Sequence, residues 1–370
     1  MPTPHHHFIQ DDDTLNDACL ALSSEAILAL DTEFVRESTY YPQFCLLQIA
    51  SPTRTYCIDP LVTSTSDPLR KLLTNSSITF VVHSARQDLE LIWQQVGTLP
   101  SRMLDSQIAA GLSGRNEQIG YGALVESILG VRLAKEQTRT DWSQRPLTNE
   151  QLHYAADDVS YLIQAYPHLQ DEITALGRST WWEEDSKALL CHSLYETDCL
   201  SAWRKVKGLL ELDAKSISRG IMIAHWRENV AKSADRPRTW ILNDETLLSW
   251  CSSASIPSRG HRMRNVPPAQ QSHYLAELAE HMNQPHPTEL ADRLSLISKS
   301  KIDPARKSLV KKLGSMTQQI ARDLNISPSV LASRKDLEGF IDQPERSRLL
   351  SGWRNDILGT TLTSLLNDSV

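Results

Sequence analysis

A short apolar run ends in two carboxylates at Ala26-Ile-Leu-Ala-Leu-Asp31-Thr-Glu33-Phe34. The run predicts a buried β-strand, and side chains along a strand alternate between its two faces. Asp31 and Glu33 therefore project to the same side of the strand. Two acids at the end of a buried strand repel each other and resist the loss of hydration unless a cation lies between them. The stretch predicts a cation site, although an isolated pair of this kind is also typical of a strand that ends in a polar loop.

A second acidic motif follows the predicted strand Ile78-Thr-Phe-Val-Val82. The apolar spacing from Ala85 to Gln95 predicts a helix, which places Asp88 in the first turn, facing the end of the preceding strand. An acid in a first turn is also commonly a favourable partner of the helix dipole and nothing more. Asp88 therefore indicates a functional site only in combination with the other acidic motifs.

The third motif is Gln151-Leu-His-Tyr154-Ala-Ala-Asp157-Asp158, within a predicted helix. Tyr154 and Asp158 are four residues apart, about 40° around the helix, and share a face. His153 precedes Asp158 by five residues, which leaves it roughly 140° away. We therefore predict that Tyr154 accompanies Asp158 and that His153 lies on the helix surface. Asp157 points elsewhere on the helix and is expected to be solvated.

In this order the three motifs resemble the DEDD superfamily of 3′→5′ exonucleases, and the tyrosine indicates its tyrosine-type branch. The resemblance narrows to the ribonuclease D family and covers the chain from about residue 20 to its end. The additional stretches that carry it are Asp31-Thr-Glu-Phe-Val-Arg36, Thr39-Tyr-Tyr-Pro-Gln43, Asp105-Ser-Gln107, Arg139-Thr-Asp-Trp142, Arg145-Pro-Leu147 and Tyr154-Ala-Ala-Asp-Asp158.

The resemblance implies an α/β ribonuclease H-like exonuclease domain, with a mixed sheet flanked by helices, followed by two small all-α HRDC-type helical domains. At 370 residues the chain is long enough for two or three domains. Strand signals near residues 26–34, 43–50, 54–59 and 78–82 and helical signals at 122–129 and from 149 to about 166 agree with the first domain. The expected bounds are 1–180 for the exonuclease domain, 195–278 for the first helical domain and 288–370 for the second, more diverged one.

The second half of the chain carries the stretches that resemble HRDC modules. In the first module these include Ala224-His-Trp-Arg-Glu228 and Asp235-Arg-Pro-Arg238. In the second they are Arg334-Lys-Asp-Leu337 and Gly352-Trp-Arg354. The proline-rich Asn283-Gln-Pro-His-Pro287 predicts a boundary between the two.

The family's chemistry implies a role for each acid. Asp31, Glu33 and Asp158 would hold the metal ion that activates water, and Asp31 would bridge to a second ion, which Asp88 reaches mostly through water. Two ions suit phosphodiester hydrolysis, and oxygen ligands without a Cys or His pattern indicate Mg²⁺ or Mn²⁺. A phenol with a pKa near 10 is a poor base at neutral pH, so Tyr154 is expected to orient the attacking water.

Four residues are weaker candidates for RNA contact: Gln43, Gln107, Arg139 and Phe34. Phe34 either stacks on the terminal base or packs in the core. By resemblance the substrate is structured RNA with an unpaired 3′ tail, chiefly tRNA precursors, which is trimmed to release nucleoside 5′-monophosphates. Two alternatives stay open: a DNA 3′→5′ exonuclease on the same fold, because the carboxylates do not distinguish RNA from DNA, and a non-catalytic nucleic-acid-binding scaffold.

Charge divides the chain into two halves. Residues 1–200 carry 13 Lys/Arg and 27 Asp/Glu, for a net −14, and residues 201–370 carry 25 and 18, for a net +7. The basic half could capture the RNA backbone, although +7 is also typical of ordinary helix surfaces. The six cysteines are scattered, which suits a reducing cytosol. We expect a soluble, cytoplasmic monomer without a membrane segment, with His5-His-His7 in a loose terminus.

Overall fold

The computed structural model describes residues 6–64, 66–133, 140–196, 198–253, 263–283 and 304–367. The chain forms two compact units, each built from segments that are distant in sequence. The first combines Met1–Val35, Phe44–Tyr195 and Pro304–Val370, and the second combines Arg36–Gln43 with Glu196–Asp303.

A six-stranded mixed sheet lies at the centre of the first unit. Its order is β1-β4-β3-β2-β5-β6, with parallel β1/β4, β2/β5 and β5/β6 pairs and an antiparallel β3/β4 pair. The predicted strands are confirmed as β2 (Ile27–Val35), β3 (Gln43–Ala50), β4 (Thr55–Ile58) and β5 (Thr79–Val82), and two further strands are β1 (His6–Ile9) and β6 (Met103–Asp105). The expectation of a loose terminus is wrong for His6 and His7, because both pair with β4.

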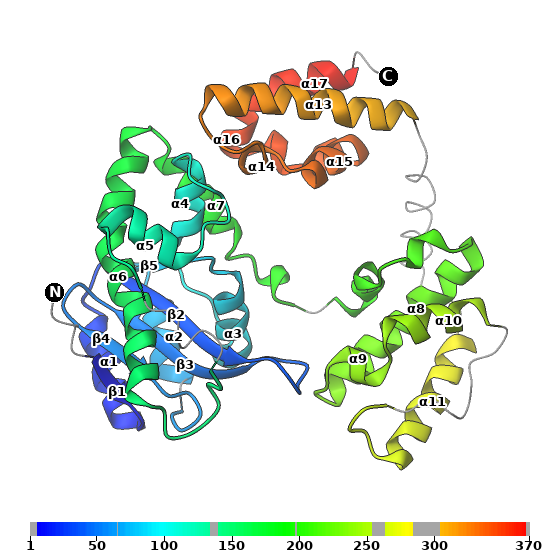
Figure 1. The fold of residues 1–370 in the computed structure, drawn as a ribbon, viewed down its shortest axis with the longest axis horizontal. Coiled ribbons are helices and arrows are strands. Elements are labelled where there is room, and N and C mark those ends of the chain that lie inside the picture. The colour runs from blue at the N-terminus through cyan, green and yellow to red at the C-terminus, as the bar shows by residue number, and fades with distance from the viewer. Residues whose placement is uncertain are drawn as a thin grey trace. The chain divides into compact units, whose positions relative to one another are not determined.

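Helices cover both faces of this sheet, as the alternation along β2 requires (Figure 1). Leu28 and Leu30 share one core with α1 (Asp12–Leu22), α2 (Ser66–Leu73) and α3 (Arg86–Val96). Ala29 points to the opposite core, which contains residues of α4 (Ser106–Leu112), α5 (Tyr121–Leu129), α6 (Asn149–Ala175) and α7 (Ser179–Ala188). The prediction of a mixed sheet flanked by helices is therefore confirmed.

Local hydrogen bonds place the two helices that carry the downstream acids. Thr148 and Gln151 form a capping box at the start of α6, which satisfies backbone groups that the first helical turn leaves open. The carboxylate of Asp105 accepts from the backbone N–H groups of Ser84 and Ala85, at 3.0 and 2.9 Å, just before α3. Asp105 thereby holds the turn from which the Asp88 helix begins.

The last described helices belong to the same unit as the sheet and do not form a separate one. They are α13 (Pro304–Asp323), α14 (Pro328–Leu331), α15 (Arg334–Asp342), α16 (Gly352–Arg354), a π-helical turn (Asn355–Gly359) and α17 (Thr360–Asn367). Trp353 stacks on Trp181 of α7 with ring centroids 4.3 Å apart. Arg354 donates to both carboxylate oxygens of Asp185, also on α7. We call residues 304–367 the C-terminal module.

The second unit is helical and has its own hydrophobic core, which is rich in tryptophan. It contains α8 (Ala214–Ser233), α9 (Arg238–Ile241), α10 (Asp244–Ser252) and α11 (Pro268–Asn283), together with short 3₁₀ turns at Cys199–Lys205 and Leu209–Glu211. The segment Arg36–Gln43 also belongs to this unit, where the Tyr40 hydroxyl donates to the buried Glu228 carboxylate at 2.8 Å.

The helical second half is thus as predicted, whereas its assignment to HRDC-type domains and their exact bounds stay predictions. Most of the proline-rich boundary at 283–287 lies outside the described residues. Among the helices that are described, none combines the length and apolar character needed to cross a lipid bilayer.

Candidate active site

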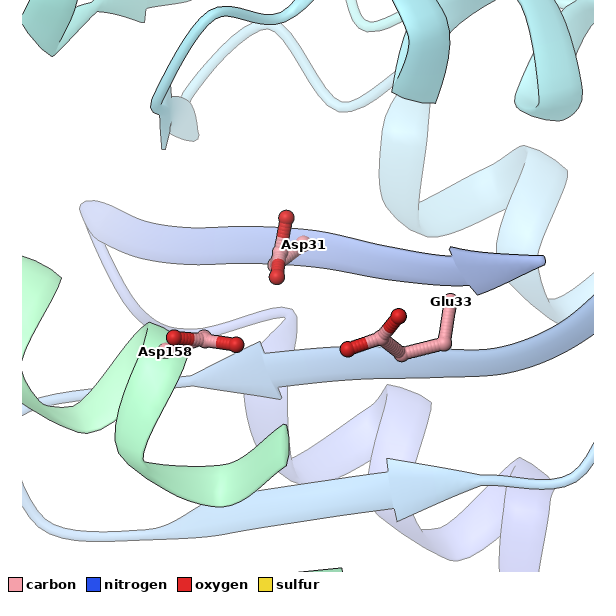
Figure 2. A group of neighbouring side chains, drawn as sticks. All are labelled: Asp31, Glu33 and Asp158. Carbon is pink, nitrogen blue, oxygen red and sulfur yellow. The ribbon is translucent and has the colours of Figure 1, made fainter. Parts of the chain in front are cut away.

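Three carboxylates meet beside the central strand β2. Asp31 and Glu33 project from one face of β2, and Asp158 reaches them from α6 (Figure 2). One oxygen from each of the three lies within 4.8 Å of the others. The spacing along the strand and the position of Asp158 within a helix were both predicted from sequence, and the fold brings them to one point.

Burial and mutual repulsion dominate the electrostatics of this cluster. Loss of hydration raises the pKa of Glu33 to about 10 and that of Asp158 to about 8, with further increases from neighbouring acids. Burial followed by the charge of Asp158 raises the pKa of Asp31 well above its usual range. Without a counter-charge, these groups favour holding protons over ionising. The cluster therefore has the chemistry of a cation site, where hard oxygen donors fit a divalent ion.

Asp88 approaches the cluster from the other side of the sheet. It lies in the first turn of α3, as predicted, and is buried. Its Oδ1 accepts from the hydroxyl of Thr32 at 2.5 Å, and Thr32 stands between Asp31 and Glu33 on β2. Burial, with a smaller increase from the charge of Asp31, raises the pKa of Asp88 well above its usual range. Asp88 is thus electrostatically part of the cluster, but its direct partner is a hydroxyl.

Tyr154 and His153 have different surroundings although they are adjacent in sequence. Tyr154 lines the same pocket as Asp31 and Asp158, and its ring lies 6.2 Å from that of Trp142. His153 is exposed, with Nδ1 2.6 Å from the carbonyl oxygen of Asn149 and its ring against His6. Asp157 is half-buried, and burial raises its pKa, so it is less solvated than expected.

The pocket has a volume of about 510 Å³ and opens beside the carboxylates. Its lining residues are Asp31, His83, Gly120, Tyr121, Gly122, Ala123, Leu133, Tyr154, Asp158 and Leu162. Sequence reasoning missed two side chains of this wall, His83 and Tyr121. His83 stands in the same motif as Asp88, which was an available signal, whereas Tyr121 follows a loop and carries none.

The four RNA-contact candidates fall in different places. Phe34 packs against the core formed with α1 to α3, on the opposite face of β2 from Glu33. Gln107 donates through Nε2 to the Ile119 carbonyl at 3.0 Å, next to the pocket wall. Gln43 is exposed and belongs to the second unit, and Arg139 lies outside the described residues. Contact with RNA stays a prediction for all four.

Comparison with known proteins assigns the family. A family model for a 3′-5′ exonuclease matches residues 6–174. Ribonuclease D of Zymomonas mobilis is 34% identical over 98% of this chain and 94% of its own, and that of Pseudomonas paraeruginosa is 31% identical over 100% of both. The crystal structure of Escherichia coli RNase D, described as an exoribonuclease involved in structured RNA processing, has a TM-score of 0.86 at 28% identity and covers 98% of this chain and 99% of that one. Because these likenesses extend over nearly the whole chain, the protein belongs to the ribonuclease D family of 3′-5′ exoribonucleases.

Proposed function

We propose that Asp31, Glu33, Asp88 and Asp158 hold two divalent ions, Mg²⁺ or Mn²⁺, at the catalytic centre of this exoribonuclease. The observation that carries the proposal is the convergence of three half-buried carboxylates within 4.8 Å, where ionisation is unfavourable without a counter-charge. When bound, the ions would supply an activated water and neutralise charge on the phosphate and the leaving oxygen. Asp31 would bridge them, and Asp88 would act mostly through water.

The residues around the carboxylates have their own tasks. Tyr154 lines the pocket next to Asp158, a position from which its hydroxyl would orient the attacking water. The pocket of about 510 Å³ falls within the range of roughly 300–1,000 Å³ typical of small-molecule sites, so it suits a single terminal nucleotide and not a duplex. This size supports removal of nucleotides one at a time from a 3′ end, with release of nucleoside 5′-monophosphates.

The substrate is proposed to be structured RNA with an unpaired 3′ tail, chiefly tRNA precursors. Charge supports RNA capture by the helical half of the chain, which carries a net +7. Within the C-terminal module, exposed Lys307, Lys311 and Lys312 lie along α13, with spacings that place Lys307 and Lys311 on one side of the helix. The five proposed catalytic residues lie within one copy of the chain, and a monomer is proposed as the active form.

The test is an activity assay on a tRNA with a short 3′ extension and on a matching single-stranded DNA, each with Mg²⁺, with Mn²⁺ and with EDTA. Stepwise 3′ shortening of the RNA that is abolished both by EDTA and by Asp31→Ala is the expected result. The matched control is Asp17→Ala, which removes an exposed acid on α1. Trimming of DNA alone would overturn the proposed substrate, and full activity of Asp31→Ala would overturn the proposed site.

A further inference from the structure

The segment Ser113–Gly120, between α4 and α5, leads into one wall of the pocket, which it joins at Gly120. Its Ile119 carbonyl accepts two hydrogen bonds, one from Gln107 Nε2 and one from His83 Nε2, both at 3.0 Å. The next two residues, Gly120 and Tyr121, line the pocket directly. The position of Ile119 therefore determines the position of the pocket wall that Gly120 and Tyr121 form.

The Tyr121 side chain connects the same wall to the catalytic helix. Its hydroxyl donates to the Asp157 carbonyl of α6 at 2.9 Å, next to Asp158 in sequence. Its ring lies against His83 with centroids 5.7 Å apart. The wall is thus fixed on its inner side by groups that adjoin the carboxylate cluster.

The outer side of Ser113–Gly120 contacts the C-terminal module. Ser329 donates through its hydroxyl to Glu117 Oε1 at 2.6 Å. Gly114 adopts a φ of +89°, and a Cβ placed there would come within 2.7 Å of the Asn325 carbonyl oxygen. The side chain at Ser329 and the backbone at Asn325 therefore approach the segment at two separate points, and only glycine fits the second.

A buried arginine joins the two parts at the end of α4. Arg178 donates through one guanidinium nitrogen to the Leu112 carbonyl and through another to the Leu324 carbonyl at the end of α13, each at 2.5 Å. Arg178 is only 8% exposed, and its bond to the Leu112 carbonyl is buried. Together with the stack of Trp353 on Trp181, this bridge makes the module a fixed neighbour of the segment.

We propose that the C-terminal module is a positioning element of the active site: through Glu117 and Gly114 it holds Ser113–Gly120, and through Ile119 it sets the wall against which the terminal nucleotide rests. This inference rests on the proposed function of the carboxylate site. It differs from RNA capture, which requires a substrate long enough to reach the module's surface. A positioning role affects even a dinucleotide, because the wall touches the nucleotide that is removed.

The test uses Glu117→Ala, Ser329→Ala and the double variant, assayed on the 5′-phosphorylated dinucleotide pApA and on a long RNA. We expect KM to rise about fivefold on both substrates, with kcat nearly unchanged. This is less than the roughly tenfold or more that a hydrogen bond to a charged group contributes directly, because the bond acts on the nucleotide only through the wall. The double variant should match Glu117→Ala, because once Glu117 is removed the Ser329 hydroxyl has no bond to it left to lose. Glu117→Gln should restore KM, since its amide oxygen still accepts from Ser329.

The control is Asp342→Ala, which breaks the Arg306–Asp342 ion pair inside the C-terminal module without touching Ser113–Gly120. It should leave KM on pApA unchanged. Amide hydrogen exchange provides a readout that does not depend on activity: protection of residues 119–122 should fall in Glu117→Ala and Ser329→Ala but not in Asp342→Ala.

Two results would overturn the inference. One is an unchanged KM on pApA together with unchanged exchange at residues 119–122. The other is a KM that rises on long RNA alone, which would leave the module with capture as its only role. Failure of the proposed carboxylate site shows separately, as retained activity of Asp31→Ala, and the exchange measurement still decides the inference in that case.

Discussion

Replacement of Asp158 by asparagine should stabilise the metal-free protein at alkaline pH while abolishing its activity. Burial raises the pKa of Asp158 to about 8, far above that of an exposed aspartate. A carboxyl group whose pKa is higher in the folded than in the unfolded state contributes stability at low pH, and that contribution is lost as pH rises toward the folded-state pKa. Asparagine has nearly the same shape and no charge to lose.

The size of this stability loss follows from the difference between the pKa of Asp158 in the folded chain and its pKa in the unfolded chain. Between about pH 5.5 and pH 8 the unfolded chain has Asp158 ionised and the folded chain still holds its proton, so the free energy of unfolding falls by about 1.4 kcal/mol per pH unit. Over this window the loss is roughly 3 kcal/mol from Asp158 alone. Glu33, whose pKa is raised to about 10, also lowers the free energy of unfolding as pH rises. This second loss occurs in the wild type and, to a smaller degree, in the variant, which lacks the Asp158 charge.

The assay is urea unfolding in EDTA at both pH values, for wild type, Asp158→Asn and Asp17→Asn. The wild type and the exposed Asp17 control should lose stability from low to high pH, and Asp158→Asn should lose roughly 3 kcal/mol less. Mg²⁺ at about 1,000 times its Kd should reverse the order at pH 8, because it adds about 4.1 kcal/mol to the protein that binds it, more than the roughly 3 kcal/mol lost. Equal pH dependence of Asp158→Asn and wild type in EDTA would refute the argument.

Four further substitutions test other parts of the structure. Tyr154→Phe should lower kcat about 100-fold without changing thermal stability by much, while His153→Ala should leave kcat unchanged; the reverse pattern in a single-turnover assay would exchange their roles. Asp105→Ala should cost about 2–3 kcal/mol in urea unfolding, since two backbone N–H groups before α3 lose their acceptor, and an unchanged midpoint would contradict this. Trp353→Ala should cost about 3–5 kcal/mol and expose the C-terminal module to limited proteolysis ahead of the sheet domain, whereas simultaneous cleavage of both would contradict the docking seen here.

The sequence by itself determined the features that depend on short separations along the chain. Asp31 and Glu33 share a face because a strand alternates every residue, and Tyr154 accompanies Asp158 because a helix turns once in 3.6 residues. The motif order then identified the family, and the four strands with strong apolar runs lie where they were expected. Such local rules hold in any tertiary context that preserves the element.

Only the tertiary structure decided what depends on distant partners. The short strands β1 and β6 form because β4 and β5 offer backbone groups to pair with. Runs of only four and three mixed polar and apolar residues carry no such signal in the sequence. Tyr121 and His83 line the pocket because the helices and loops that carry them pack beside α6. Neither residue type by itself predicts such a position. Likewise the C-terminal module contacts Glu117 and Trp181 through long-range packing, and periodicity along one helix carries no information about which surface its buried face will meet.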